Sequence, residues 1–227
     1  MPFSPENLRQ VRRRLEEACR RAGRSPESVQ LLAVTKTVPV ERIQEALQAG
    51  LTLFGENYIQ EAQLKIETLG QGTWHFIGHL QRNKAKAAVR LFSMIETLDS
   101  LSLAIELNRL GLQAEKTLEV LVQINEAGEA SKAGLAPEEA LRLLEESASW
   151  PGLRIRGLMT LPPYDPDPER SRPWFRSLAL RQKEWQKQFP QITLEHLSMG
   201  MSHDFEVAIE EGATLIRVGT ALFGARG

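Results

Sequence analysis

Short apolar runs alternate with amphipathic segments along almost the whole chain. Runs rich in apolar and β-branched residues predict eight strands, at residues 31–36, 51–57, 74–80, 91–97, 118–125, 153–160, 193–199 and 214–220. Segments with apolar residues at helical spacing predict seven helices between them, at residues 40–50, 57–70, 82–90, 100–111, 137–148, 173–189 and 203–212. This alternation predicts a parallel sheet in which each helix crosses over to the next strand.

A further helix is predicted before the first strand, over about residues 4–22. Ser4 provides its N-cap, and a proline at the first helical position supports the same start. At the ends of two later helices, Gly50 and Gly212 fit the left-handed position that terminates a helix before the next strand. The one loop rich in breaking residues covers residues 161–173, after the sixth strand.

Eight strands joined by crossover helices match the count of a closed (β/α)8 barrel. An open doubly wound sheet shows the same alternation and differs only in strand order, so it remains the alternative. The chain has no glycine-rich dinucleotide fingerprint after the first strand, which favours the barrel. We therefore expect one α/β domain over residues 1–227, a (β/α)8 TIM-type barrel, with residues 1–25 forming an N-terminal helix that packs on it.

The composition mainly argues against certain classes of partner and location. Lys and Arg total 28 and Asp and Glu total 29, so the net charge of −1 argues against a nucleic-acid partner. No apolar run approaches the roughly 18 residues that a membrane-spanning helix needs. The single cysteine, Cys19, cannot form an intrachain disulfide and is interpreted as a small buried residue. We expect a cytoplasmic protein without a nucleic-acid or membrane partner.

The functional residues of such barrels lie at the carboxyl ends of the strands. Lys36 ends the first apolar run, where a desolvated amine could form a Schiff base with an aldehyde, although most lysines at such positions are simply solvated. After the seventh run, Ser202 lies in a glycine turn just before a helix whose first turn is expected to hold Asp204. Residues 217–220, Arg-Val-Gly-Thr, end the eighth run. Such turns commonly bind phosphate through backbone N–H groups, although Ser202 could equally be only an N-cap.

The first and last strands of a closed barrel are neighbours, so these phosphate-binding turns would face Lys36. A ligand with a phosphate at one end and an aldehyde at the other fits this placement, and pyridoxal 5′-phosphate (PLP) has that shape. A cofactor-free aldolase that acts on a phosphosugar through Lys36 is an alternative. His75 and His79 lie on a predicted strand with Gly78 between them, which argues against shared metal ligation, and we expect no metal.

Six segments spread from residue 31 to residue 224 carry a family resemblance: AVTKTVP around Lys36, FGENYIQEA, HFIGHLQRNK, GLMT, SMGMSHDFEVAIEEG and RVGTALFG. Together they resemble the PLP homeostasis protein family, also called the YggS or PROSC family. The resemblance implies a monomeric fold-type III barrel similar to the N-terminal domain of alanine racemase, with PLP held as an aldimine on Lys36. It also implies a role in intracellular vitamin B6 homeostasis, with PLP-dependent apo-enzymes as candidate partners.

Carried over by position, the resemblance implies a set of cofactor-binding residues. Ser202, Gly219 and Thr220 would hold the phosphate, Arg217 would face the pyridine nitrogen, and Asn57 would line the pocket near the ring.

A guanidinium at the ring nitrogen would limit the chemistry. Arg217 is always charged and offers only donors, so it would leave that nitrogen unprotonated and weaken carbanion stabilisation. A racemase of this fold class also uses a second base, typically a tyrosine from an added β domain. Neither Tyr58 nor Tyr164 matches that position, although Tyr58 could reach the pocket. We therefore expect a PLP carrier without catalytic residues, and a PLP-dependent amino-acid racemase or related fold-type III enzyme is the alternative.

Overall fold

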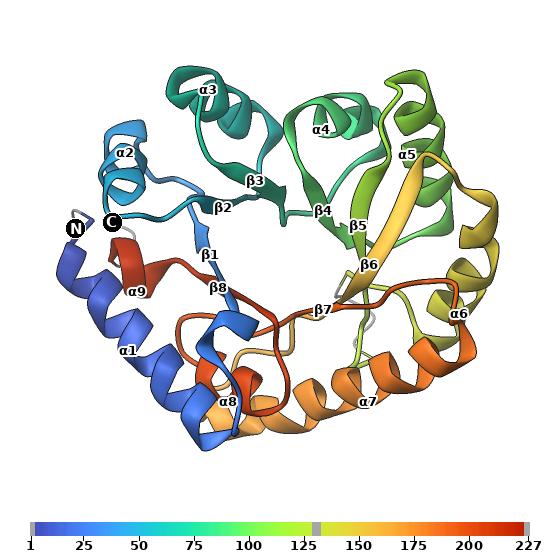
Figure 1. Ribbon diagram of the computed structural model, residues 1–227. Coiled ribbons are helices and arrows are strands. Elements are labelled where there is room, and N and C mark those ends of the chain that lie inside the picture. The colour runs from blue at the N-terminus through green and yellow to red at the C-terminus, as the bar shows by residue number, and fades with distance from the viewer. Residues whose placement is uncertain (1–2, 129–132, 225–227) are drawn as a thin grey trace.

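The computed structural model describes residues 3–128 and 133–224, which form a closed barrel of parallel strands surrounded by helices (Figure 1). The strands are β1 (Gln30–Val34), β2 (Leu53–Glu56), β3 (Thr73–Phe76), β4 (Met94–Leu98), β5 (Leu118–Gln123), β6 (Leu153–Met159), β7 (His196–Ser198) and β8 (Leu215–Val218). Each strand pairs with its neighbours in sequence, and β1 also pairs with β8. The predicted (β/α)8 barrel is therefore confirmed, and the open sheet is excluded.

Helices alternate with the strands in the predicted order. The α-helices are α1 (Pro5–Arg21), α2 (Val40–Gln48), α3 (Ile59–Leu69), α4 (Ala85–Leu91), α5 (Leu101–Gln113), α6 (Pro137–Glu146), α7 (Arg172–Gln188), α8 (Phe205–Glu210) and α9 (Thr220–Phe223). Short 3-10 helices are η1 (Pro26–Ser28), η2 (Arg82–Lys84), η3 (Ser147–Ser149) and η4 (Pro168–Ser171). Across the described ranges, no helix combines the length and apolar character needed to cross a membrane.

The helix ends follow the local sequence signals, with one correction. The Ser4 hydroxyl accepts a hydrogen bond from the Glu6 backbone N–H at 3.2 Å, which confirms the predicted cap of α1. Gly50 and Gly212 have φ values of +86° and +107° and directly follow the last turns of α2 and α8, as predicted. Asp204, however, precedes α8 instead of lying in its first turn, because its backbone is not helical.

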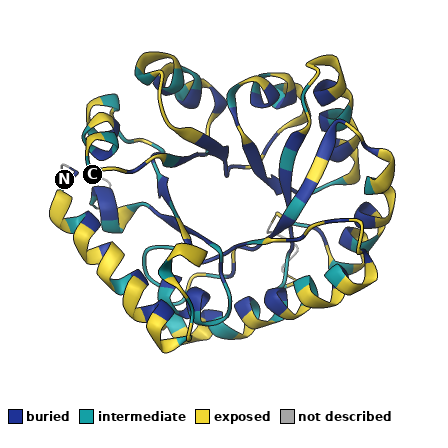
Figure 2. Cartoon of the chain, in the orientation of Figure 1, coloured by how far each residue is buried: buried dark blue, intermediate teal, exposed yellow. Residues whose placement is uncertain are grey.

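Two apolar layers make up the core. Inside the barrel, side chains at alternating strand positions form a cluster of Leu32, Ile77, Met94, Leu121, Met159 and Leu215. A larger layer fills the space between the outer face of the strands and the helices, and each helix buries the side that faces the barrel (Figure 2). Full burial of one large apolar side chain contributes about 1.5–3 kcal/mol, so the two layers hold the strands and helices together.

The first helix packs beside the last two. In Figure 1, α1 runs along α8 and α9, so the two ends of the described chain lie close together. The rings of Phe3 and Phe223 are 5.8 Å apart. The guanidinium of Arg14 lies 4.5 Å from the ring centre of Phe205 and pairs with Glu206 at 2.6 Å. These contacts hold α1 against α8 and α9, the helices on either side of β8.

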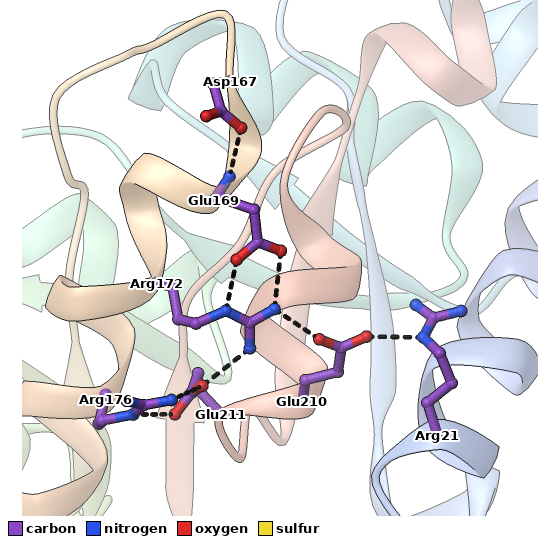
Figure 3. Close-up of polar contacts among 7 residues, drawn as sticks. All are labelled: Arg21, Asp167, Glu169, Arg172, Arg176, Glu210 and Glu211. Atoms are coloured by element: carbon purple, nitrogen blue, oxygen red, sulfur yellow. Dashed lines mark hydrogen bonds and ion pairs between the residues drawn. The ribbon is translucent and has the colours of Figure 1, made fainter.

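A network of ion pairs on the surface ties α7 to the end of α8 and to α1 (Figure 3). Arg172, at the start of α7, donates to Glu169, Glu210 and Glu211 at distances of 2.6, 2.7 and 2.8 Å. Glu210 also pairs with Arg21 of α1 at 2.7 Å. Because α8 follows directly on the loop after β7, the network holds in place the helix next to that loop.

The arginines of this network keep its carboxylates ionised. The hydrogen bond from Arg172 lowers the pKa of Glu169, and bonds from Arg176 and Arg172 lower the pKa of Glu211. A carboxylate whose pKa is lower in the folded protein stabilises the fold above its unfolded pKa. That stabilisation is lost as the pH falls through the lowered value, so the network contributes at neutral pH and not in strong acid.

Substituting Met for Arg172 removes the one cation that all three carboxylates share. We expect the free energy of unfolding at pH 7 to fall by about 1–2 kcal/mol. The difference should shrink in 1 M salt and below about pH 4, where screening or protonation already weakens the network. Urea denaturation followed by tryptophan fluorescence measures this. Arg176→Met, which removes only an exposed partner of Glu211, should lose less than half as much, and equal losses would contradict the central role of Arg172.

Candidate cofactor site

The predicted site residues gather at the carboxyl ends of four adjacent strands. Lys36 lies two residues beyond β1, which ends at Val34 and not at Lys36 as expected. Asn57 follows β2, and Ser202 lies in the turn after β7. Arg217 is within β8, and Gly219 and Thr220 come directly after that strand. Because β1 pairs with both β2 and β8, and β8 with β7, all six residues share one rim of the barrel.

The alternation of side chains along β1 and β8 shows which strand positions face the barrel interior. On β1, Leu32 belongs to the interior cluster and Val34 packs against it, and the strand ends there, two residues before Lys36. On β8, Leu215 belongs to the same cluster, and the inward series continues to Arg217, whose Cα is the partner of Leu32 in the sheet register. The strand alternation therefore accounts for the inward direction of Arg217, and Lys36 lies in the turn that follows the inward-facing Val34.

The loops after β7 and β8 are joined through Ser202. Its hydroxyl oxygen accepts hydrogen bonds from the backbone N–H groups of Gly219 and Ala221 at 3.2 and 3.3 Å. Ser202 therefore binds the start of α9, while Asp204 occupies the position before α8 and its carboxylate accepts from the Met201 N–H at 2.7 Å. The result is a compact group of hydroxyl and amide donors at the rim.

Arg217 lies almost completely inside the barrel, with 3% of its surface exposed. It donates to the Ser198 hydroxyl at 2.5 Å and to the Thr160 carbonyl at 2.8 Å. The Ser198 hydroxyl in turn donates to Glu96 at 2.5 Å. Burial lowers the pKa of Arg217, while the charges of Glu96 and Asp204 act in the opposite direction. A guanidinium starts from a pKa above 12, so we treat Arg217 as a cation.

The chain of hydrogen bonds continues to the other end of the barrel. Glu96 pairs through its second oxygen with Nδ1 of His75 at 2.8 Å. His75 and His196 are among the residues that line a cavity of about 620 Å³ at the amino ends of the strands, opposite the predicted site. His75 is therefore a partner of a buried carboxylate, and His79 contacts Asp99 at 2.9 Å. Within the described ranges, no three potential metal-ligating side chains cluster together.

The sequence patterns do not single out Glu96 and Ser198. A signal was available, because both are polar residues inside buried strands, and Glu96 stands two positions after the inward-facing Met94. A charged side chain at an inward position of a barrel strand requires a buried partner. Here the bonded partners of Glu96 are His75 of β3 and Ser198 of β7, and Ser198 links it to Arg217 of β8, more than a hundred residues later in the chain.

Two features of the site fit PLP. Oδ1 of Asn57 is buried and has no hydrogen-bond partner among the described residues, so it can accept a bond from a ligand. The backbone of Gly78 lies so close to Asn57 that a Cβ at residue 78 would come within 2.2 Å of the Asn57 carbonyl oxygen. The hydroxyl and backbone amide groups around Ser202 suit a phosphate.

Comparison with known proteins first defines a broad class. A model of the family described as alanine racemase, N-terminal domain, matches residues 7–227. The structure of an alanine racemase from Clostridium difficile 630 covers 99% of this chain with a TM-score of 0.77 and 14% identity, and the chain spans 58% of that protein. At this identity the likeness concerns the fold alone.

Relatives of similar length identify the family within this class. The chain is 45% identical over 223 residues to the pyridoxal phosphate homeostasis protein of Aquifex aeolicus (strain VF5), covering 97% of each. PipY of Synechococcus elongatus PCC7942, solved with PLP bound, is 38% identical, with a TM-score of 0.83 and coverage of 93% of this chain and 100% of PipY. The chain belongs to the family of the pyridoxal phosphate homeostasis proteins, which confirms the resemblance seen in the sequence.

The buried charge of Glu96 provides a test of the interior network. In Glu96→Gln, the cation of Arg217 loses its nearby negative charge, so we expect the free energy of unfolding to fall by about 3 kcal/mol. Glu119→Gln, at a partly exposed carboxylate on β5, is the control and should cost at most about 0.5 kcal/mol. Urea denaturation measures both, and equal stability of the two variants would show that Glu96 does not compensate Arg217.

Proposed function

We propose that this protein binds PLP at the carboxyl rim of its barrel and takes part in intracellular PLP homeostasis. The observation that carries the proposal is the convergence of Lys36, Arg217 and the donors around Ser202 on adjacent strands β7, β8 and β1. The name of the Aquifex aeolicus relative and the PLP bound to PipY support it.

In this proposal, the phosphate of PLP is held by the turns after β7 and β8. Ser202 contributes its hydroxyl group, which the backbone N–H of Gly219 orients, and Thr220 contributes its backbone N–H at the start of α9. Hydrogen bonds to a charged group contribute about 1.5–3 kcal/mol each, so this end supplies much of the affinity. Arg217 donates to the ring nitrogen and Asn57 lines the ring.

Lys36 provides the covalent link. Bound PLP supplies an aldehyde carbon, which condenses reversibly with a primary amine and releases one water molecule. The amine of Lys36 is the nucleophile, because its place after β1 carries it to the barrel mouth between the turn after β8 and Asn57 after β2. Exchange of this link with free amines would give a route for loading and release.

The residues around the ring favour a carrier over an enzyme. Arg217 offers only donors and leaves a ring nitrogen unprotonated, which weakens stabilisation of a carbanion. Both tyrosines are exposed, Tyr58 to 58% and Tyr164 to 71%, and Tyr164 packs against the ring of His203 with 4.8 Å between ring centres. Neither is held in the barrel as a fixed base. An amino-acid racemase is the second candidate, supported by the shared fold.

The proposal also covers the oligomeric state, the cellular location and the partners of the protein. We place the protein in the cytoplasm as a monomer that passes PLP to apo-enzymes. The composition, with its near-neutral net charge, agrees with a small-molecule ligand and with protein recipients more than with a polyanion.

Lys36→Ala should abolish covalent attachment of PLP. We expect borohydride reduction of the PLP-loaded wild type to leave an adduct that peptide mass mapping assigns to Lys36, and the variant to show none. Lys84→Ala, at a partly exposed lysine of η2, is the control and should retain the adduct. An adduct on Lys84 or another lysine of the wild type would contradict the assignment.

The carrier function predicts little turnover of amino acids. A missing acid–base partner removes about 10²–10⁴-fold in rate, so exchange of α-protons in deuterated water should remain far below about 1 s⁻¹ for every amino acid tested. A chiral assay of the same samples detects racemisation. Turnover at about 1 s⁻¹ or faster would favour the racemase candidate instead.

A further inference from the structure

A buried ion-pair cluster between the barrel strands and α3 forms hydrogen bonds to the turn that carries Lys36. Lys65, on the inner face of α3, has only 5% of its side chain exposed. Its ammonium donates to Glu56 at 2.7 Å, to Glu61 at 2.6 Å and to the backbone carbonyl of Thr35 at 2.6 Å. An ammonium has three N–H donors, so this geometry gives each donor one acceptor.

The same carboxylates bind the residues on both sides of Lys36. Glu56 accepts a hydrogen bond from the Thr35 hydroxyl at 2.6 Å. Glu61 accepts one from the Thr37 backbone N–H at 2.6 Å. The cluster of Glu56, Glu61 and Lys65 therefore holds the backbone immediately before and immediately after Lys36.

The conformation that the cluster holds is one the chain would not adopt by itself. Thr37 has φ +63°, and a β-branched residue rarely occupies this left-handed region. Such a conformation persists where the surrounding contacts determine it, and it tends to occur at functional sites. The bond from Thr37 to Glu61 is a contact of this kind, because it fixes the N–H of the strained residue itself.

Packing alone does not account for charged groups at this place. The neighbouring inward positions of α3, Ile59 and Ala62, are apolar, and an apolar residue at position 65 would continue that face. Glu56 is completely buried, and its second oxygen has no hydrogen-bond partner among the described residues. Buried ion pairs add little to stability relative to apolar replacements, and in some proteins they specify one conformation. The conformation that this cluster contacts is the turn of Lys36.

We propose that Glu56, Lys65 and Glu61 are positioning residues that fix the turn of Lys36 and so present its amine to the aldehyde of PLP. This inference rests on the proposed function, since it assumes that Lys36 bonds to PLP. The three residues lie on the outer side of the strands, toward α3, and act on the cofactor only through their bonds to Thr35 and Thr37, the neighbours of Lys36.

The test compares two ligands in one variant. Glu61→Ala removes the acceptor of the Thr37 N–H and one partner of Lys65. Pyridoxamine 5′-phosphate shares the ring and phosphate of PLP but carries an amine in place of the aldehyde, so it does not bond to Lys36. We expect the variant to bind PLP about tenfold more weakly, with a matching loss of borohydride-trapped adduct. Loss of one hydrogen bond to a charged group, here the bond from the Thr37 N–H to Glu61, changes a binding constant by about this factor. Its affinity for pyridoxamine 5′-phosphate should change by less than about twofold.

The matched control lies on the same helix. Glu67→Ala removes an exposed carboxylate that accepts from Gln63 and does not contact the turn, so both affinities should stay at the wild-type value. If circular dichroism shows that Glu61→Ala does not fold, the isosteric pair Glu61→Gln and Glu67→Gln is compared in its place. We expect Glu61→Gln to lose PLP affinity in the same direction, because a neutral amide is a weaker acceptor and leaves Lys65 with less negative charge.

The outcomes separate this inference from the proposed function. A wild-type protein without an adduct at Lys36 would overturn the covalent role of Lys36 in the proposed function, on which this inference rests. A wild type with the adduct, together with position-61 and position-67 variants of equal PLP affinity, would overturn only the positioning role. A parallel loss of affinity for both ligands in the position-61 variant would also overturn it, because that result indicates general damage to the pocket.

Discussion

The pairing of β1 with β8 is the constraint on which the site depends. Four residue pairs, from Gln30 with Leu215 to Ala33 with Val218, set the register between the first and last strands. This register brings Lys36 and the turn at Gly219 to the same rim, although they are far apart in the chain. It also sets which side chains of the two strands share a face, because a shift by one residue would place the inward side chains of one strand beside the outward side chains of the other.

The barrel interior contains both apolar side chains and a chain of hydrogen-bonded polar groups. Apolar side chains fill the middle, and a chain of polar groups from His75 through Glu96 and Ser198 to Arg217 crosses it. A buried guanidinium is tolerated where a carboxylate lies close and its N–H groups are bonded, and both conditions hold here. The position of the Arg217 guanidinium therefore depends on β3, β4 and β7 as well as on β8.

The sequence was sufficient to predict the barrel and the carboxyl ends of its strands as the place of the candidate site. It was not sufficient to predict the buried residues that contact the candidate site residues. Strands buried on both faces read as continuous apolar runs, so all eight were visible, and the rule that function lies at their carboxyl ends led to Lys36 and Arg217. The partners of those residues come from distant segments: Ser198 and Glu96 for Arg217, and Lys65 for the turn of Lys36. No local pattern encodes such pairs. Asp204, ahead of α8, likewise has a distant partner, because its carboxylate accepts a hydrogen bond from Ser171 of η4.

The contact of α1 with α8 and α9 has a consequence for synthesis of the protein. In a chain that emerges from the ribosome, α1 and β1 appear before the elements that cover them, which are α8, β8 and α9. Until then β1 has one edge without a neighbour, and an unpaired edge can join a strand of another molecule. The high contact order of this closure makes it a slow step in folding.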